Sequence, residues 1–256
     1  MGHIIVTANQ KGGVGKSTTS EALAEGLACN RKKTLLVDLD AQGSISLTAA
    51  ADANKPTSYE VLTKQCTVEE AIQHRANRAD ILPASNNLSR LDVELTATGK
   101  EYKLKEQLKP ILAMYDFIVI DTPPTLGVLT VNALTAAHSI VIPAQADIYS
   151  LQGIGQLAET IDAIKAYTNP GLNLAGILLT RYNARSILSR DMAEAASETA
   201  QQIGTFLYRT VIREAVALKE AQARQQSIFN YAPKSNVAMD YMAFVDEFLE
   251  RGIHRA

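Results

Sequence analysis

Gln10-Lys11-Gly12-Gly13-Val14-Gly15-Lys16-Ser17-Thr18 is the stretch that decides the fold of this 256-residue chain. An apolar run over residues 3–6 precedes it, and a helical pattern begins near Ser17. A strand, a glycine-rich loop and a helix in this order form the context that a phosphate-binding loop requires. The sequence therefore predicts a polyphosphate site close to the start of the chain.

Each residue type in this loop has its own physical reason. Gly12, Gly13 and Gly15 lack a Cβ, so the backbone can adopt positive φ and approach a phosphate closely. Successive N–H groups and the positive end of the following helix make a concave anion site. Lys16 is expected to reach the β- and γ-phosphates, and the Ser17 hydroxyl is expected to coordinate Mg²⁺. The predicted ATP-binding residues of the loop are Lys11, Gly12, Gly13, Val14, Gly15, Lys16, Ser17 and Thr18.

One position departs from the ordinary pattern G-x-x-x-x-G-K-[ST]. Gln10 stands where that pattern has its first glycine, and Lys11 adds a second lysine. The stretch resembles the deviant Walker A motif, K-G-G-x-G-K-[ST], of the ParA/MinD superfamily of ATPases. A flexible, solvated turn would also be rich in glycine and lysine, but the flanking strand and helix favour a phosphate loop.

Length and composition bound the class of protein. A hydrophobic content of 46% and a charged content of 20% are ordinary for a soluble globular protein. No apolar run approaches the roughly 18 residues that a membrane-spanning helix needs, and we find no signal peptide. The two cysteines lie far apart and the four histidines are scattered, which argues against a disulfide framework and a metal cluster. We expect a cytoplasmic protein without a membrane partner.

Two carboxylates follow the second apolar strand. Residues 34–37 form a short apolar run that ends in Asp38-Leu39-Asp40. Open α/β sheets bind ligands at the carboxyl ends of their strands. The alternation of an extended chain would place Asp38 and Asp40 on the same side, so that one could hold Mg²⁺ or its waters while the other orients the attacking water. A polar turn after a strand is the alternative interpretation.

A second acidic signal lies in the middle of the chain. The apolar run 117–120 ends in Asp121, followed by Thr122-Pro123-Pro124. An apolar strand ending in aspartate is the Walker B arrangement, in which the carboxylate holds Mg²⁺ directly or through water. The prolines end the strand and stiffen the loop beside the γ-phosphate. Ser17, Asp38 and Asp121 are thus the predicted metal ligands.

The rest of the chain alternates apolar strands with helical patterns. Alternation of this kind predicts an α/β fold with one doubly wound, mostly parallel sheet and helices on both faces. No linker of low complexity and no repeat divides the chain, so a single P-loop domain over residues 1–256 is expected. The predicted strands cover 3–6, 34–37, 81–84, 115–121, 139–143 and 172–180. The predicted helices cover 17–29, 59–62, 68–74, 88–95, 102–112, 131–137, 154–164, 186–203, 214–223 and 237–249.

Over nearly its full length the sequence resembles the ParA/Soj family of partition ATPases. The resemblance is carried by the residues at 11–18, 38–43, 115–124, 176–183, 220–221 and 231–235. It implies that Lys11 is the signature lysine, which reaches across an ATP-sandwiched homodimer to the phosphates of the partner. It also implies that Asp40 aligns the attacking water and that Asp121 is the Walker B carboxylate. Lys11, Lys16 and Asp40 are then the expected catalytic residues.

The same resemblance implies a function, with ATP and Mg²⁺ as cofactors. A protein of this family hydrolyses ATP to ADP and phosphate, slowly when alone. Its ATP-bound dimer binds nonspecific DNA on the nucleoid, and a ParB-like centromere-binding partner stimulates hydrolysis and releases it. The expected role is segregation of a plasmid or chromosome.

Several positions depart from the family or carry weaker assignments. Arg213 stands where Soj-like proteins usually have a proline near the adenine, and Ala217 stands where they tend to carry a DNA-binding arginine. Arg181 and Asn183 are assigned to the adenine side. Residues 181–234 hold eight Lys/Arg against five Asp/Glu, a local balance of +3 that a solvated surface would also explain. The DNA-binding candidates are Arg185, Arg190, Lys219 and Arg224.

The sequence also bears on three other functions. A MinD-like ATPase that positions cargo at a membrane or on the nucleoid is the main alternative, but the membrane form needs a basic amphipathic C-terminal helix, and residues 246–255 are acidic and mixed. A relative of the nitrogenase iron protein would need bridging cysteines after the middle strands, and none follows Cys66. A GTPase would carry the guanine-reading N-K-x-D pattern, which this sequence lacks.

Overall fold

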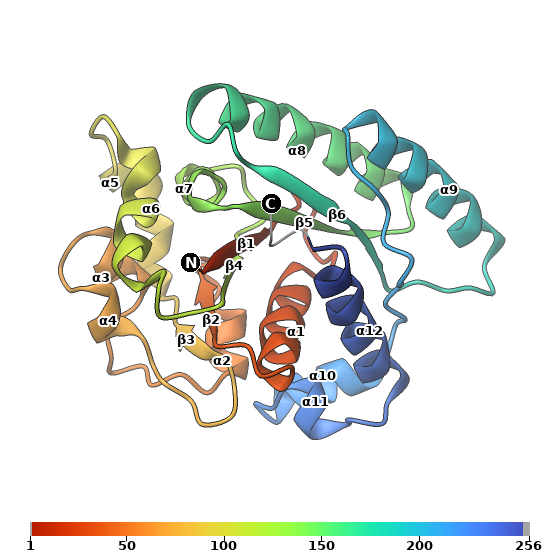
Figure 1. Cartoon of the computed structure of the whole chain (residues 1–256), viewed down its shortest axis with the longest axis horizontal. Helices are drawn as coiled ribbons and strands as arrows, with labels where there is room; N and C mark the ends of the chain where they lie inside the picture. The colour runs from red at the N-terminus through yellow and green to blue at the C-terminus, as the bar shows by residue number, and fades with distance from the viewer. Residues whose placement is uncertain (1, 253–256) are drawn as a thin grey trace.

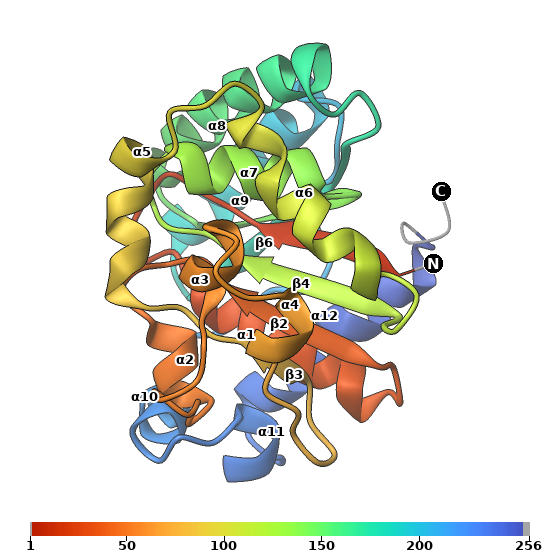
Figure 2. The ribbon, with the colours of Figure 1, turned by 90° about the vertical axis from the view of Figure 1, so that its left-hand side faces the viewer.

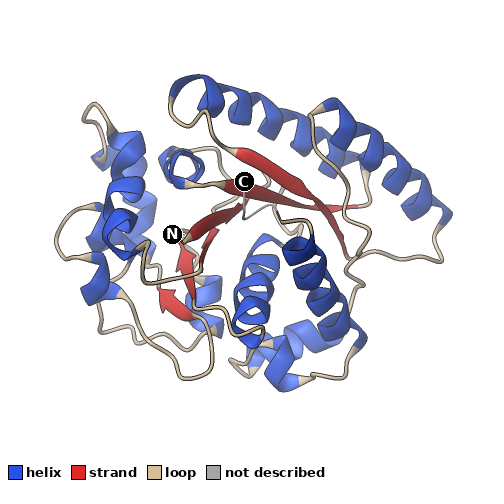
Figure 3. Ribbon diagram, in the orientation of Figure 1, coloured by secondary structure: helices blue, strands red, loops and turns tan. Residues whose placement is uncertain are grey.

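The computed structural model describes residues 2–252, so residues 253–255 of the acidic and mixed C-terminal segment 246–255 lie outside the described part. At its centre is a parallel sheet of six strands in the order β3-β2-β4-β1-β5-β6. Figure 3 shows this sheet enclosed by helices. The strands are β1 His3–Thr7, β2 Thr34–Asp38, β3 Asp80–Leu82, β4 Phe117–Asp121, β5 Ser139–Gln145 and β6 Asn173–Thr180. The predicted fold class is confirmed.

Helices cover both faces of the sheet (Figure 1). One face carries α1 and the C-terminal helices α10 to α12, and the other carries α3 to α9. The α-helices are α1 Lys16–Cys29, α2 Ser44–Thr48, α3 Ser58–Leu62, α4 Val68–Ala71, α5 Leu91–Glu94, α6 Lys103–Leu108, α7 Val128–Ala136, α8 Ile148–Tyr167, α9 Ile187–Gln202, α10 Val216–Ala223, α11 Ile228–Tyr231 and α12 Asn236–Glu250. Short 3₁₀ turns are η1 Asn86–Arg90, η2 Lys100–Tyr102 and η3 Lys109–Ile111.

The strands are continuous apolar runs because both faces of the sheet are buried. In β1 every residue is buried, and its side chains alternate between two cores. Ile4 and Val6 belong to the core beneath α3 to α8, whereas Ile5 belongs to the core beneath α1 and α12. This alternation is what a period of two requires of a strand covered by helices on both sides.

The helices between residues 50 and 110 are shorter than the sequence patterns suggested. The single helix predicted over 102–112 is wrong, because the structure divides this stretch into η2, α6 and η3, and Pro110 lacks the N–H that a continuing helix needs. The pattern at 88–95 likewise divides into η1 and α5. Two of the short helices are stabilised locally by capping boxes, Thr57 with Glu60 and Thr67 with Glu70.

Gly176 produces a bulge in β6. Leu174 pairs with Ile140 and Ile177 pairs with Ile142, so two residues of β6 oppose one of β5. Gly176 lies in this bulge with φ of +113°, a conformation that residues with a side chain rarely adopt. A Cβ at this position would lie 2.7 Å from ring carbons of both Phe206 and Tyr208. The glycine therefore lets the buried Tyr208 and the partly buried Phe206 pack directly on the strand.

Gly176→Ala is expected to be strongly destabilising. The added methyl group meets two ring systems and a disfavoured backbone angle at once, so we expect a loss of about 3 kcal/mol or more in the free energy of unfolding. Urea denaturation monitored by circular dichroism measures this loss. Gly155→Ala is the matched control, because a Cβ there meets nothing within 4 Å. Equal stability of the two variants would contradict the role given to Gly176.

Figure 2 shows α2 and α10 on the side of the molecule opposite the start of β1. That side holds the carboxyl ends of the parallel strands, where Asp38, Asp121 and Thr180 end their strands. Among residues 2–252, no helix is both long enough and apolar enough to cross a bilayer. Because open α/β sheets bind ligands at the carboxyl ends of their strands, we expect the functional residues at this edge of the sheet.

Candidate functional site

The glycine-rich loop connects β1 to α1 at the carboxyl edge of the sheet. Gly13 and Gly15 have φ of +78° and +84°, as the sequence predicted, whereas Gly12 is not among the positive-φ residues. Thr180, at the end of β6, supports the loop by donating a hydrogen bond of 2.7 Å from its hydroxyl to the Val14 carbonyl. The loop thus has the conformation that exposes its N–H groups to an anion.

Lys16 points into the loop rather than into solvent. Its side chain is buried, and Nζ donates to the Lys11 carbonyl oxygen at 3.2 Å. Burial lowers the pKa of Lys16, while the carboxylates of Asp121 and Asp40 act in the opposite direction. Because burial removes water from the Lys16 ammonium group, a strongly anionic ligand is needed to compensate for the lost hydration.

Asp121 lies beneath the loop at the end of β4. Oδ1 accepts hydrogen bonds from Ser20 Oγ at 2.8 Å and Thr7 Oγ1 at 3.4 Å. Oδ2 is buried and has no hydrogen-bond partner among the described residues. Burial and the neighbouring Asp38 raise the pKa of Asp121 to about 7, although the hydroxyls of Ser17 and Ser20 act against this rise.

The unpaired Oδ2 of Asp121 indicates whether Asp121 and Ser17 could bind a metal ion. A buried, unpaired carboxylate oxygen is rare, and a hard cation or its water would satisfy it. The Ser17 hydroxyl opposes the rise in the pKa of Asp121, and Ser17 also lines the cleft. A serine hydroxyl and a carboxylate are the oxygen donors that Mg²⁺ binds beside a phosphate chain. The pair Ser17 and Asp121 therefore fits the predicted cation.

Asp38 and Asp40 have different surroundings. Asp38 is buried opposite Asp121 in the sheet and uses both oxygens within the protein. Its Oδ1 accepts from Asp40 N at 3.1 Å, and its Oδ2 accepts from Ser46 N at 3.0 Å and Ser46 Oγ at 2.7 Å. Burial raises the pKa of Asp38 to about 6. Asp38 thus anchors the loop that presents Asp40, and its role as a metal ligand stays a prediction.

Asp40 lines the cleft that the sequence predicted for phosphates. Its Oδ1 accepts a hydrogen bond of 3.0 Å from Gln42 N, which closes a short turn after β2. The cleft has a volume of about 500 Å³ and brings the loop together with residues that follow β2 and β6. Its lining comprises Gly12, Gly13, Gly15, Lys16, Ser17, Thr18, Asp40, Ser44, Leu47, Thr48, Pro124, Arg181, Gln222 and Ala223.

A second cavity of about 130 Å³ adjoins this cleft, and the two share Gly15, Thr18, Arg181 and Gln222 in their linings. Arg181, at the end of β6, has φ of +49°, a strained angle for a residue with a side chain. Arg181 lines both cavities, and its assignment to the adenine side stays a prediction. Asn183 lines neither cavity, and its Oδ1 accepts from Arg185 N at 3.0 Å.

Lys11 is bound within its own subunit. Its Nζ lies 2.7 Å from both oxygens of Asp147 and 3.4 Å from Ser150 Oγ. The Tyr149 ring lies 5.7 Å away. Burial favours the neutral form of Asp147, but the hydrogen bond and charge of Lys11 and the hydrogen bonds from Ser150 together outweigh it and lower the pKa of this carboxyl. Lys11 therefore has an internal partner that must be displaced before it can reach another molecule.

Three residues that the sequence did not single out position the first half of the loop. Asn9 is buried, accepts from Lys11 N at 3.0 Å and donates to the Pro143 carbonyl at 2.7 Å. Gln145 donates from Nε2 to the Gly13 carbonyl at 2.9 Å. A Cβ at Gly153 would lie 3.2 Å from Asn9 Oδ1, so this glycine allows α8 to approach the loop. Their positions in the sequence were the one signal for these roles: Asn9 lies just before the loop, Gln145 ends β5, and Gly153 lies in the helix that follows.

The four candidates for DNA contact lie on two separate elements. Arg185 lies two residues before α9 and Arg190 lies in its first turn, whereas Lys219 and Arg224 lie in and just after α10. All four are exposed, and none forms a salt bridge with another residue in the described part of the chain. They are accessible to an anionic partner, and their role in DNA binding stays a prediction.

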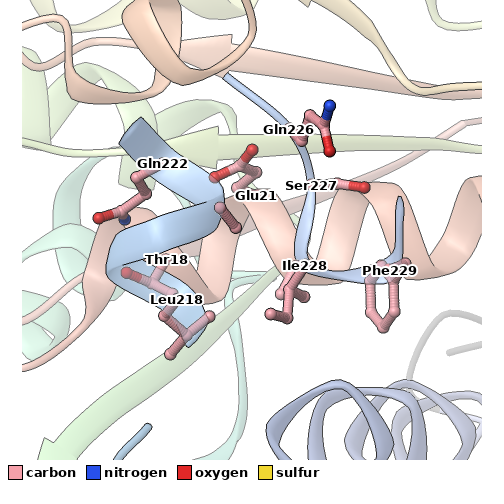
Figure 4. A pocket seen from close by; sticks show the side chains of 10 residues that line it. Thr18, Glu21, Leu218, Gln222, Gln226, Ser227, Ile228 and Phe229 are labelled. Carbon is pink, nitrogen blue, oxygen red and sulfur yellow. The ribbon is translucent and has the colours of Figure 1, made fainter. Parts of the chain in front are cut away.

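A small cavity of about 10 Å³ lies beside the cleft, between α1 and the α10–α11 segment (Figure 4). Glu21 of α1 lines it, and its Oε1 is buried without a hydrogen-bond partner among the described residues. Burial and the nearby Glu25 raise the pKa of Glu21 to about 8. Arg75 and Arg78 both pair with Glu25 at 3.0 Å. Glu21 is therefore the acid of this cluster that lacks a cationic partner.

Glu21→Gln is expected to stabilise the protein in a pH-dependent way. The folded state holds a proton on Glu21 up to a pH of about 8, whereas the unfolded chain releases it near 4.5. Stability of the native sequence should therefore fall as pH rises through this window. The advantage of the variant should grow by on the order of 1 kcal/mol per pH unit. Urea denaturation at pH 5, 6.5 and 8 measures it.

Glu159→Gln, on the exposed surface of α8, is the matched control for that experiment. Its stability should follow that of the native sequence at every pH. If Glu21→Gln and the native protein give parallel curves, Glu21 is ionised in the folded state and the interpretation of the cavity is wrong.

Comparisons with known proteins agree with this geometry. A family model described as an AAA domain (AAA_31) matches residues 2–174. The chain is 38% identical over 257 residues to the sporulation initiation inhibitor protein Soj of Bacillus subtilis (strain 168), covering 98% of this chain and 100% of Soj. It is 37% identical over 255 residues to the chromosome partitioning protein ParA of Myxococcus xanthus (strain DK1622), covering 98% and 89%.

A solved structure shares the whole fold. The cobyrinic acid a,c-diamide synthase of Mycobacterium smegmatis with bound ADP and magnesium superposes with a TM-score of 0.81 at 32% identity, covering 98% of this chain and 95% of that one. The match to the family model, together with Soj and ParA relatives that align along nearly all of the chain, establishes its family. The chain belongs to the ParA/Soj family of AAA-type ATPases.

Proposed function

We propose that this protein is a Mg²⁺-dependent ATPase that dimerises when it binds ATP, binds nonspecific DNA as a dimer and segregates a plasmid or chromosome together with a ParB-like partner. One observation carries the proposal. The loop presents two lysines in different states: Lys16 is desolvated inside the cradle, and Lys11 is held outside it by Asp147. In such a loop one lysine binds the nucleotide of its own subunit, and the other is available to the nucleotide of a second subunit. This arrangement suits an enzyme whose active site is completed when two copies form a dimer.

The phosphate half of the site supports the ATPase step. The loop N–H groups and Lys16 would bind the β- and γ-phosphates, and Ser17 and Asp121 would hold Mg²⁺, which supplies neutralisation of the phosphate charge. Asp40, in the cleft, would orient the attacking water. Among the described residues of a single subunit, Lys16 is the one lysine that lines the cleft where charge develops as the β–γ bond breaks. Turnover should therefore be slow until Lys11 of a second copy adds its charge.

Exposed apolar side chains around the cleft support dimerisation. Six of them belong to segments that follow or flank the carboxyl ends of the strands: Leu47, Ile148, Tyr149, Ile187, Leu188 and Val216, each more than 60% exposed. Exposed apolar groups gathered on one side of a molecule mark an interaction surface. Ile148 and Tyr149 directly follow Asp147, so contact with a second copy would form beside the Lys11–Asp147 pair.

Asp147→Asn is expected to promote ATP-dependent dimerisation. The substitution removes the charge that holds Lys11 but keeps the side-chain size and the N-cap oxygen of α8. The free energy needed to release Lys11 then falls, and the dimer should form at an ATP concentration lower by about threefold to tenfold. Analytical ultracentrifugation across an ATP titration measures this shift. Asp162→Asn, an exposed change on α8, should leave it unaltered. A weaker dimer in Asp147→Asn would show that the pair supports assembly.

Sedimentation with and without ATP and duplex DNA tests the whole proposal, with the Asp40→Ala variant used to hold the ATP state. Retention on nonspecific DNA should require ATP and should weaken steeply with salt. Alanine at Arg185, Arg190, Lys219 and Arg224 should reduce retention without reducing ATP binding. A protein that dimerises with ATP but ignores DNA at low salt would remove the DNA function. Flotation with liposomes and ATP separates it from the MinD-like alternative.

A further inference from the structure

We propose that Asp92 is a positioning residue for ATP hydrolysis: it fixes the loop that joins Asp121 to α7 and carries Pro124 to the phosphate cleft. The inference rests on the proposed ATPase function. Asp92 lies in α5 and lines neither the phosphate cleft nor the cavity beside it. It acts through the backbone at the start of α7, so it orients part of the site without contacting the nucleotide.

The Asp92 carboxylate lies against the first residues of α7. Its Oδ1 accepts a hydrogen bond of 2.8 Å from Val128 N. Gly127, the residue before α7, has no side chain with which to cap the helix, and the first turn of α7 holds no acidic residue. A Cβ at Gly127 would lie 2.8 Å from Asp92 Oδ1 and 3.0 Å from Oδ2, so the glycine leaves room for the carboxylate. An acid from 36 residues away thus takes the place of a local cap.

The segment that carries Asp92 is itself anchored. Three of its residues are buried in the core beneath α3 to α8, namely Leu88, Leu91 and Leu95. On the exposed side, Tyr59 Oη donates to Glu94 Oε2 at 2.9 Å, which joins α5 to α3. A cap held by such a fixed element can restrain a neighbouring loop, whereas a cap on a mobile segment would move with the loop.

The loop between β4 and α7 is restrained at both of its ends. At its start, Thr122 Oγ1 donates to the Thr7 carbonyl at 2.9 Å, and at its end Asp92 holds the first turn of α7. Pro123 and Pro124 stand between these two points, and because their rings fix φ the loop has few ways to adjust internally. Pro124 lines the phosphate cleft. Release of the α7 end should therefore move this wall of the cleft.

The position of the loop decides which step Asp92 should affect. The phosphate loop is held by Thr180 and Gln145, which belong to β6 and β5, so nucleotide binding should not depend on Asp92. Pro124 and Asp40 line the same cleft, where the attacking water would be oriented. A misplacement of about 1 Å in a reaction site can lower the rate about a hundredfold. Because the other end of the loop stays restrained, we expect a smaller loss.

Steady-state kinetics of ATP hydrolysis and calorimetric titration with ADP test the assignment together. Asp92→Ala should lower kcat about tenfold, while the KM for ATP and the Kd for ADP stay within about twofold of the native values. Asp92→Asn keeps an oxygen that can accept from Val128 N, so it should retain most of the native kcat. Hydrogen exchange of residues 122–128 should be faster in Asp92→Ala and close to native in Asp92→Asn.

Thr67→Ala is the matched control, because it removes the side-chain cap of another short helix, α4, and Thr67 does not line the cleft. It should lower the Tm about as much as Asp92→Ala does and leave kcat unchanged. Native kcat or native hydrogen exchange in Asp92→Ala, an equal loss of kcat in Thr67→Ala, or a parallel loss of ADP affinity in Asp92→Ala would each overturn the assignment. Absence of ATP hydrolysis by the native protein would instead remove the proposed ATPase function, and the positioning role with it.

Discussion

Lys16→Ala is expected to abolish ATP binding at millimolar concentrations. Lys16 is buried against the loop, where burial lowers its pKa and where Asp121 and Asp40 are the nearby charges. A phosphate chain bound without this ammonium group would face those two carboxylates uncompensated. Removing one partner of such a desolvated pair costs about 3 kcal/mol or more, which is at least about a hundredfold in affinity.

Calorimetry with ATP and Mg²⁺ measures the affinity of Lys16→Ala directly. Lys55→Ala removes an exposed lysine of the loop before α3 and should bind ATP as the native protein does. Lys11→Ala provides the second comparison. Because Lys11 is paired with Asp147 in the single subunit, its loss should leave initial ATP binding nearly intact but abolish the dimer and hydrolysis. Equal loss of initial binding in both lysine variants would contradict the separate roles assigned to them.

Asp40→Ala is expected to keep ATP binding and stop turnover. The Asp40 side chain lines the cleft but makes only a local hydrogen bond with Gln42 N, so its removal leaves the loop, Lys16 and Asp121 in place. Without a group to orient the attacking water, hydrolysis should fall about a hundredfold or more. The ATP-bound dimer should then persist for far longer than that of the native protein.

Single-turnover hydrolysis and size-exclusion chromatography after ATP loading measure the two effects of Asp40→Ala together. Asp162→Ala, an exposed carboxylate change on α8, should hydrolyse ATP at the native rate. Asp38→Ala offers a sharper contrast. Asp38 holds Ser46 and Asp40 through both of its oxygens, so its loss should release the loop and lower stability as well as turnover. Native turnover in Asp40→Ala would remove its catalytic role.

The strongly patterned parts of the chain predicted their structure well. The glycine loop, the strand before it and the helix after it follow from local rules, because positive φ at Gly13 and Gly15 and the burial of β1 need no distant contact to be anticipated. The prediction was weaker between residues 50 and 110. There the helices are one or two turns long, and capping at Thr57 and Thr67, rather than an extended apolar stripe, determines where two of them begin.

The sequence by itself determined the α/β class, the phosphate loop and the aspartates that end β2 and β4, since residue type and spacing carry that chemistry. Only the tertiary structure decided which partners those residues have. Lys11 meets Asp147, 136 residues away, and Arg213 meets Asp240, 27 residues away. Oε1 of Glu21, in the cavity between α1 and the α10–α11 segment, has no hydrogen-bond partner among the described residues. Such pairings depend on how α8, α10 and α12 pack at the carboxyl edge of the sheet, and no local pattern specifies the contacts between distant segments.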